Sequence, residues 1–130
     1  MAFDFPKRFR YADSHEYVST EVDNLVRIGL SAFAVDQLGD IIFVDRPKVG
    51  DKLQRGVRFG SVESVKAVEE MYAPLDGTVI QCNTSVLSNP EELQNDPHGE
   101  GWLLLLRPSL YEQLEELMTA EAYAAKVAFS

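Results

Sequence analysis

The most constraining stretch of this chain runs from residue 60 to residue 74, where a single lysine separates two apolar-rich segments of similar length. Two valines bracket a polar pair before Lys66, and a valine and a methionine bracket another polar pair after it. Pro74 ends the second segment, because proline cannot donate a hydrogen bond to a sheet ladder. The pattern predicts two strands that meet at a tight turn with Lys66 at its tip.

The same stretch also allows a helical interpretation. The residues around Lys66 contain no Asn-Gly or Asp-Gly pair, which two-residue hairpin turns favour. Ala67, Glu69 and Glu70 are good helix formers, so a helix over residues 61–72 competes with the hairpin. Local chemistry alone leaves both possibilities open.

Size and charge exclude several classes of function. At 130 residues, with 45% hydrophobic and 25% charged residues, the chain is expected to form one domain over residues 1–130 with a modest core. The net charge is −9, and the acids are spread along the chain. This charge opposes binding to a phosphate backbone or to an anionic membrane surface, so we expect neither nucleic acid nor membrane as a partner.

Cysteine and histidine are too few for a recognisable metal site. Cys82 is the only cysteine, which rules out an intramolecular disulfide, and His15 and His98 lie far apart in the sequence. We therefore expect no metal. No run of about eighteen apolar residues is present, and no apolar signal core follows the basic residues near the start. These features predict a cytoplasmic location.

Turn and cap residues divide the first half of the chain into short elements. Strand-like alternation over residues 25–30 follows Asn24, which supplies turn chemistry and predicts a hairpin with the strand before it. Ser31 is a suitable N-cap for a short helix over residues 33–38, and Gly39 is suited to end it. An apolar strand rich in β-branched residues follows up to Asp45.

The second half gives further turns, one more buried strand and two helices. Asp-Gly chemistry at residues 76–77 predicts a turn before a strand that ends near residue 83, and residues 88–93 predict a capped helical turn. Residues 102–107 predict a buried strand. Residues 109–112 form a capping-box pattern, and Thr119 is a suitable cap for a second helix. We expect a C-terminal helical segment over about residues 109–130, packed on the sheet.

Several motifs together resemble the H protein family of the glycine cleavage system. Residues 63–67, Glu-Ser-Val-Lys-Ala, resemble the lipoyl-attachment motif of that family. Residues 11–17 resemble its Tyr-x-x-x-His-Glu-Trp segment, with Tyr17 in place of the usual tryptophan, and residues 38–44 match its Leu-Gly-Asp-x-x-Phe-Val segment. The Asn-Pro to Gly-x-Gly-Trp stretch over residues 89–102 is also family-like. Val35 replaces a glutamine that the family usually has.

The resemblance implies a fold and decides between hairpin and helix. The expected fold is mainly β with small helices, a lipoyl- or biotinyl-like flattened barrel or sandwich. Lys66 then lies at a β-hairpin tip, and the C-terminal helices pack on the sheet. A primary amine on a flexible stem at an exposed turn is a suitable acylation target.

The resemblance also implies a function, which is that of a carrier and not of an enzyme. Lipoic acid would be attached covalently to Lys66 by a lipoate ligase or a lipoyl or octanoyl transferase. The carrier would accept an aminomethyl group from the pyridoxal phosphate-dependent glycine decarboxylase and deliver it to aminomethyltransferase. Dihydrolipoamide dehydrogenase would then reoxidise it. The chain itself is expected to contribute no catalytic residue and to be a monomer.

Four further residues match functional positions of the family. Glu63 matches a glutamate that the lipoylating enzyme recognises. The alternative, which explains a glutamate at this position nearly as well, is an exposed charge on a strand face. Ser14, Glu16 and Glu70 match residues that line the cleft for the loaded arm. For Ser14 and Glu16 the alternative is an exposed turn, and for Glu70 it is a solvated charge beside Glu69.

Two other classes of function remain open at this point. One is a biotin carrier, or a lipoyl domain or lipoyl-relay protein serving 2-oxo-acid dehydrogenases. Biotinyl domains resemble Ala-Met-Lys-Met at the site, which this chain lacks, and dehydrogenase lipoyl domains usually show Asp-Lys-Ala. The other is an unmodified interaction domain that has kept the fold.

Overall fold

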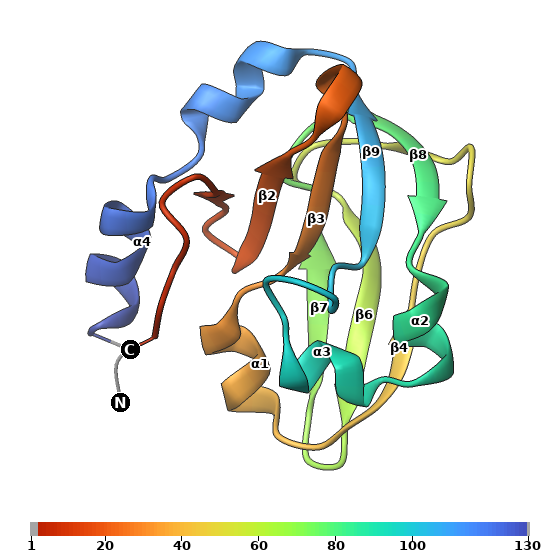
Figure 1. Cartoon of the computed structure of the whole chain (residues 1–130), viewed down its shortest axis with the longest axis vertical. Helices are drawn as coiled ribbons and strands as arrows, with labels where there is room; N and C mark the ends of the chain where they lie inside the picture. Colours follow the sequence, from red (N-terminus) through yellow and green to blue (C-terminus); the bar gives the residue numbers. More distant parts are fainter. Residues whose placement is uncertain (1–2, 130) are drawn as a thin grey trace.

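The computed structural model describes residues 3–129, which form two antiparallel sheets with short helices around them (Figure 1). The larger sheet has the strand order β1 (Arg10–Tyr11), β2 (Glu16–Thr20), β3 (Val26–Leu30), β9 (Leu104–Pro108), β8 (Gly77–Cys82) and β5 (Lys52–Leu53). The smaller sheet has the order β4 (Ile41–Asp45), β6 (Arg58–Ser64) and β7 (Val68–Tyr72). The mainly β, flattened sandwich expected from the sequence is confirmed, and the sheets do not close into a barrel.

The main core contains apolar side chains from both sheets. Ile28 and Leu30 of β3, Val62 of β6 and Met71 of β7 are at most 1% exposed and belong to one buried cluster. Successive residues of a strand point to opposite faces, so each strand contributes alternate side chains to this core. The same alternation decides which residues near Lys66 face inward.

Short helices cover the ends of the strands and begin at side-chain caps. α1 (Ala32–Leu38) begins where Ser31 Oγ accepts from Ala34 N at 3.2 Å, and it ends at Gly39, whose φ is 78°. α4 (Ala120–Val127) begins where Thr119 Oγ1 accepts from Ala122 N at 3.1 Å. These caps confirm the predictions made for Ser31, Gly39 and Thr119. Two further helices, α2 (Thr84–Ser88) and α3 (Glu91–Asn95), connect β8 to β9 in the sequence.

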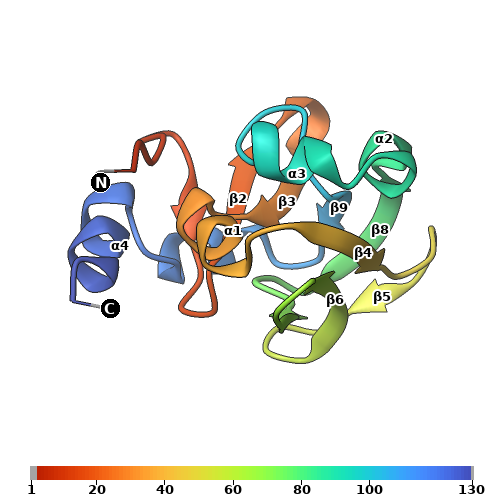
Figure 2. The same cartoon turned by 90° about the horizontal axis from the view of Figure 1, so that it is seen from below.

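The first described residues and α4 form a second, aromatic cluster at the β1 edge. Phe9 stacks on Tyr17 with ring centroids 4.7 Å apart, and Tyr11 stacks on Tyr123 at the same distance. Tyr17 Oη donates to Pro97 O at 2.7 Å, so the tyrosine that replaces the family's tryptophan has a hydrogen-bond partner. Figure 2 shows α4 and β5 at opposite ends of the molecule.

Two predictions for the C-terminal half were wrong. Residues 109–112 do not form a capping box, because the segment Tyr111–Glu116 is a 3₁₀ helix without a side-chain cap. Asp76 explains this: its carbonyl accepts from Ser109 N at 2.9 Å, and its carboxylate accepts from Gln113 Nε2. These bonds hold the segment against the start of β8. Gly77 opens β8 instead of lying in a turn, and a Cβ there would lie 2.5 Å from Arg107 O.

Two smaller predictions also need correction. The helical turn expected over residues 88–93 is present as α3, but Ser88 does not cap it and instead ends α2, which was not anticipated. The buried strand expected over residues 102–107 is β9, which starts two residues later and includes Pro108. The C-terminal helix α4 packs on β1, which is the edge strand of the larger sheet.

Candidate functional site

Lys66 lies at the tip of the hairpin that joins β6 to β7, in what we call the lysine turn (residues 64–67). Ser64 Oγ accepts from Ala67 N at 3.0 Å and donates to Ala67 O at 3.1 Å, and Ala67 O also accepts from Ser64 N at 2.8 Å. The serine side chain thus supplies hydrogen bonds that close a turn which contains no Asn-Gly pair. The hairpin is confirmed, and the helical alternative is excluded.

The lysine turn is exposed and only lightly tied to the rest of the protein. Val65 is 73% exposed, and Lys66 and Ala67 are also exposed. Val65 N donates to Asp40 O at 3.0 Å. The Cε of Lys66 lies 3.7 Å from the position that a Cβ at Gly39 would occupy. A side chain at residue 39 would therefore contact the lysine stem.

Glu63 lies exposed on the outer face of the smaller sheet. In the strand register it is the partner of Phe43 on one side and of Val68 on the other. Phe43 is 56% exposed and Val68 is 57% exposed. A carboxylate flanked by two exposed apolar side chains, three residues before Lys66, is available to an enzyme that approaches the hairpin tip.

Ser14 and Glu16 lie together in what we call the acid turn (residues 12–16), which joins β1 to β2. Ala12 N donates to Glu16 O at 2.8 Å, and His15 N donates to Ala12 O at 3.0 Å. His15 has a φ of 83°, a left-handed conformation that costs a non-glycine residue on the order of 1 kcal/mol. The cost indicates that contacts outside the turn hold this conformation.

The Glu16 carboxyl is buried with both oxygens bonded. Ser14 Oγ donates to Oε1, and Tyr72 N donates to Oε2 at 2.9 Å. Burial raises the pKa of Glu16 to about 7, although the bonds from Ser14 and Tyr72 oppose the shift. The charge of Glu69 adds to the increase. Glu16 therefore connects the larger sheet to β7 and changes its charge near neutral pH.

Glu69 and Glu70 follow Lys66 on opposite faces of β7. Glu69 pairs with the buried Val62 and lies on the same face as Met71, so it points inward and is half-buried. Burial, and then the charge of Glu70, raise the pKa of Glu69.

Glu70 points outward, where Arg58 holds it. Arg58 Nε donates to the Glu70 carboxylate, and its Nη2 lies 3.4 Å from Asp45 Oδ2. The structure thus brings Ser14 and Glu16 together and places Glu70 in a different cluster. The sequence analysis gave Glu69 no functional role. The apolar Met71, two residues later in the same strand, indicates that Glu69 lies on the buried face.

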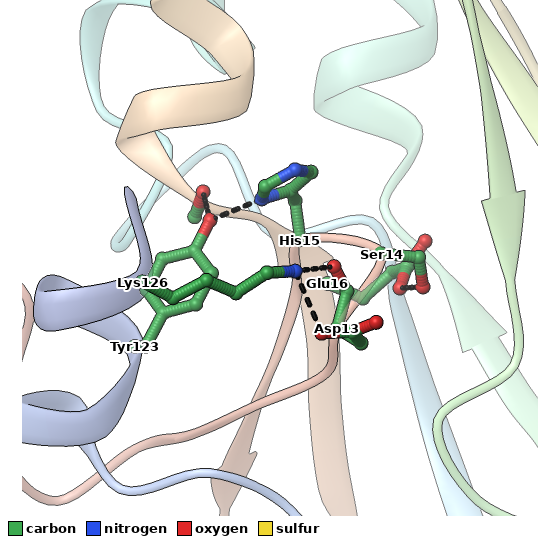
Figure 3. Close-up of polar contacts among 7 residues, drawn as sticks. Asp13, Ser14, His15, Glu16, Tyr123 and Lys126 are labelled. Carbon is green, nitrogen blue, oxygen red and sulfur yellow. Dashed lines mark hydrogen bonds and ion pairs between the residues drawn. The ribbon is translucent and has the colours of Figure 1, made fainter. Parts of the chain in front are cut away.

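Two residues of α4 contact the acid turn, and their sequence pattern had suggested no such role (Figure 3). Tyr123 Oη lies 2.6 Å from His15 Nδ1, and Lys126 Nζ lies 2.6 Å from Asp13 Oδ1. Both α4 residues are more than one hundred positions away from the turn in sequence. No local pattern connects segments so far apart.

The described residues contain neither a membrane-spanning helix nor a metal-binding cluster. Within residues 3–129, no helix is long and apolar enough to cross a membrane. The same residues contain no group of three or more His, Cys, Asp or Glu side chains that could hold a metal ion.

Comparison with known proteins gives the family. The family model described as "Glycine cleavage H-protein" matches residues 9–129. The chain belongs to the glycine cleavage H-protein family. It is 72% identical to the glycine cleavage system H protein of Synechococcus sp. (strain CC9311) and 68% identical to that of Parasynechococcus marenigrum (strain WH8102). Each alignment covers 98% of both chains.

The fold agrees with a solved member of this family. The crystal structure of a glycine cleavage system H protein from Mycobacterium marinum is similar to this chain with a TM-score of 0.87 and 34% sequence identity. The match covers 95% of this chain and 99% of that one. Proteins of the glycine cleavage H-protein family are lipoyl carriers. The exposed amine of Lys66 is therefore the group of interest for attachment.

Proposed function

We propose that Lys66 carries lipoic acid in amide linkage and that the chain is the lipoyl shuttle of the glycine cleavage system. The observation that carries this proposal is an exposed lysine at a hairpin tip, within the Glu-Ser-Val-Lys-Ala sequence, in a chain of the H-protein family. None of the ion pairs among residues 3–129 involves Lys66. Acylation of its amine therefore breaks no such pair.

With this group bound, the chain would accept the aminomethyl unit from glycine decarboxylase, deliver it to aminomethyltransferase and be reoxidised by dihydrolipoamide dehydrogenase. The protein contributes a tether and no catalytic residue. Once the carrier has docked on an enzyme, the short flexible link presents the group to that enzyme at an effective concentration of ~mM. Location in the cytoplasm and a monomeric state remain predictions from the sequence.

Ser14 and Glu16 are proposed to receive the amine of the carried unit. A carboxylate has about four acceptor sites, so Glu16 can accept a further bond beside those from Ser14 and Tyr72. The surrounding buried side chains exclude water, which would otherwise release the labile unit. Glu70 can join them only by leaving Arg58, and because exposed ion pairs contribute little stability, a cationic amine could compete with Arg58 for it.

Glu63 is proposed as a contact for the lipoate ligase or the lipoyl or octanoyl transferase. It is exposed, and Phe43 and Val68 beside it offer apolar area for the same enzyme. An exposed carboxylate between two apolar side chains can give orientation while the apolar groups give affinity. Glu63→Gln should slow lipoylation and leave an already lipoylated chain fully functional.

Two measurements test the shuttle. Intact-mass and peptide spectra of protein from its native host should show one lipoyl increment on Lys66. Glycine–bicarbonate exchange with the purified partner enzymes should then be lost in Lys66→Arg and kept in Lys48→Arg, which alters an exposed lysine before β5. A biotinyl increment, an unmodified Lys66 in native material, or exchange that survives in Lys66→Arg would refute the proposal.

A further inference from the structure

α4 contacts the acid turn through two side chains, and Figure 3 shows both pointing toward it. The Tyr123 hydroxyl is buried, 2.6 Å from His15 Nδ1 and 2.6 Å from Ser31 Oγ. Lys126 Nζ donates to Asp13 O at 2.7 Å and to Asp13 Oδ1 at 2.6 Å. Together these bonds hold Asp13 and His15, the residues on either side of Ser14.

The backbone at His15 explains why such contacts are needed. The acid turn has three residues between Ala12 and Glu16, and the third position of such a loop is left-handed and usually occupied by glycine. Histidine is strained there, but its ring gives Tyr123 a partner that glycine lacks. Ser31 N also donates to His15 O at 2.9 Å, so backbone and ring are both held.

We propose that Tyr123 and Lys126 are positioning residues, which hold the acid turn so that Ser14 stays bonded to Glu16 and the carried amine stays enclosed. The inference rests on the proposed function, because it concerns how long the carried unit is retained. α4 packs mainly on β1, and the hydrogen bonds of Tyr123 and Lys126 go to Asp13, His15 and Ser31, none of which belongs to the lysine turn. It would therefore control retention of the unit without affecting its attachment.

The consequence of losing these contacts follows from the bonds on Glu16. If the turn moves, Ser14 Oγ leaves Oε1 and water reaches the carboxyl, which is now fully buried. Water at this position would hydrolyse the carried unit: its oxygen would bond to the aminomethyl carbon as the carbon–sulfur bond breaks and the sulfur takes a proton. The aminomethanol formed would then lose ammonia as its carbon–nitrogen bond breaks, so the products would be formaldehyde, ammonia and the free thiol. The same opening would restore an ordinary solvated carboxyl at Glu16.

The test compares two tyrosine hydroxyls of one aromatic cluster. Tyr123→Phe removes the hydroxyl that contacts His15, and Tyr11→Phe removes a hydroxyl that donates to Pro6 O, outside the turn. The Tyr11 and Tyr123 rings stack on each other and both remain. In unmodified protein, carbon-13 NMR titration should find the pKa of Glu16 near 7 in wild type and in Tyr11→Phe, and a lower pKa in Tyr123→Phe.

In lipoylated and loaded protein, Tyr123→Phe should release formaldehyde at least threefold faster than wild type, and Tyr11→Phe should not. The effect should disappear in a His15→Gly background, where Tyr123 has no ring to hold. Unchanged Glu16 pKa and release rate in Tyr123→Phe would overturn the inference. If wild type cannot be lipoylated or loaded, the proposed function fails, while the NMR titration still decides on the positioning.

A second pair of variants guards against a folding defect in Tyr123→Phe. Lys126→Met removes the bonds to Asp13, and Lys7→Met removes an exposed ion pair between Lys7 and Glu121, which also joins α4 to another segment but not to the acid turn. Faster release and a lower Glu16 pKa in Lys126→Met alone support the positioning role. Equal behaviour of the two lysine variants contradicts it.

Discussion

The lysine turn and the acid turn are both short loops between antiparallel strands, but different parts of the chain hold them. The side-chain bonds of the lysine turn join residues two or three positions apart, and its tip is exposed. The acid turn is held by Tyr72, 56 positions away from Glu16, and by Lys126, 113 positions away from Asp13.

The difference corresponds to what each turn would have to do. An attachment point must be reached by several enzymes, so it needs an exposed tip that folds from its own sequence. A binding site for a labile group, which we call the seat and which is proposed to comprise Ser14 and Glu16, must exclude water. It therefore needs neighbours that only the complete fold can bring together. We therefore expect damage to distant elements to affect the acid turn and to leave the lysine turn intact.

The largest effect is expected for Tyr123→Ala. Removing a fully buried aromatic side chain should lower the free energy of unfolding by about 3–5 kcal/mol. Amide exchange should speed up across the acid turn and stay near wild type in the lysine turn, and the folded fraction should still be lipoylated at Lys66. Val65→Ala, at an exposed tip position, is the control and should change stability little. Equal loss of protection in both turns would refute the separation between them.

The pH dependence of stability gives the second effect, from Glu16. Its pKa rises from 4.5 to about 7 on folding, so the folded protein holds a proton that the unfolded chain has released between these values. Stability from this group is thus complete below pH 4.5 and is lost as the pH rises through 7, by about 3 kcal/mol in total.

Urea unfolding at pH 5 and pH 8 measures this effect. Glu16→Gln cannot ionise, and its amide can still donate to Ser14 while its oxygen accepts from Tyr72. The loss of stability between the two pH values should therefore be smaller in Glu16→Gln than in wild type. Burial lowers the pKa values of His15 and His98, and their contributions cancel in this comparison. An identical pH dependence in both proteins would show that Glu16 is not buried as described.

A smaller, local effect is expected for Ser64→Ala in the lysine turn. The hydroxyl bonds Ala67 N and Ala67 O, so its loss should cost about 1 kcal/mol and should slow lipoylation. The pKa of Glu16 should not change. Ser88→Ala, which removes an exposed hydroxyl bond to Thr84 O within α2, is the matched control. A shift of the Glu16 pKa in Ser64→Ala would show that the two turns are coupled.

The sequence predicted features that depend on near neighbours. Ser31 and Thr119 cap helices because a side-chain oxygen needs only a backbone amide three residues later. The capping box at residues 109–112 failed because Asp76, more than thirty positions earlier, holds that segment against β8. The capping rule therefore gave the right result where no distant residue bound the segment, and the wrong result where Asp76 did.

The candidate site shows the same limit. Lys66 was found from its own flanking residues, and Ser14 and Glu16 from theirs. Tyr123 and Lys126 were not assigned to the site, because only the folded chain brings α4 to the acid turn. Glu69 could have been recognised, since the two-residue period of a strand places it on the face of Met71.

The smallest effect should separate Glu69 from Glu70, which differ in the face of β7 they occupy. Glu69→Gln removes a nearby negative charge, so the pKa of Glu16 should fall slightly and stability at pH 8 should rise by about half a kcal/mol or less. Glu70→Gln removes an exposed partner of Arg58 and should leave the Glu16 pKa unchanged.

The two glutamine variants also test the proposed seat. In loaded protein, faster release of the carried unit in Glu70→Gln alone would show that Glu70 leaves Arg58 for the amine. Faster release in Glu69→Gln alone would assign that contact to the inward face, beside Glu16. Equal rates in both variants and wild type would leave Ser14 and Glu16 as the complete seat. In that case, both side chains that bind the amine belong to the acid turn, and the hairpin contributes the attachment point and the bond from Tyr72 N that holds Glu16.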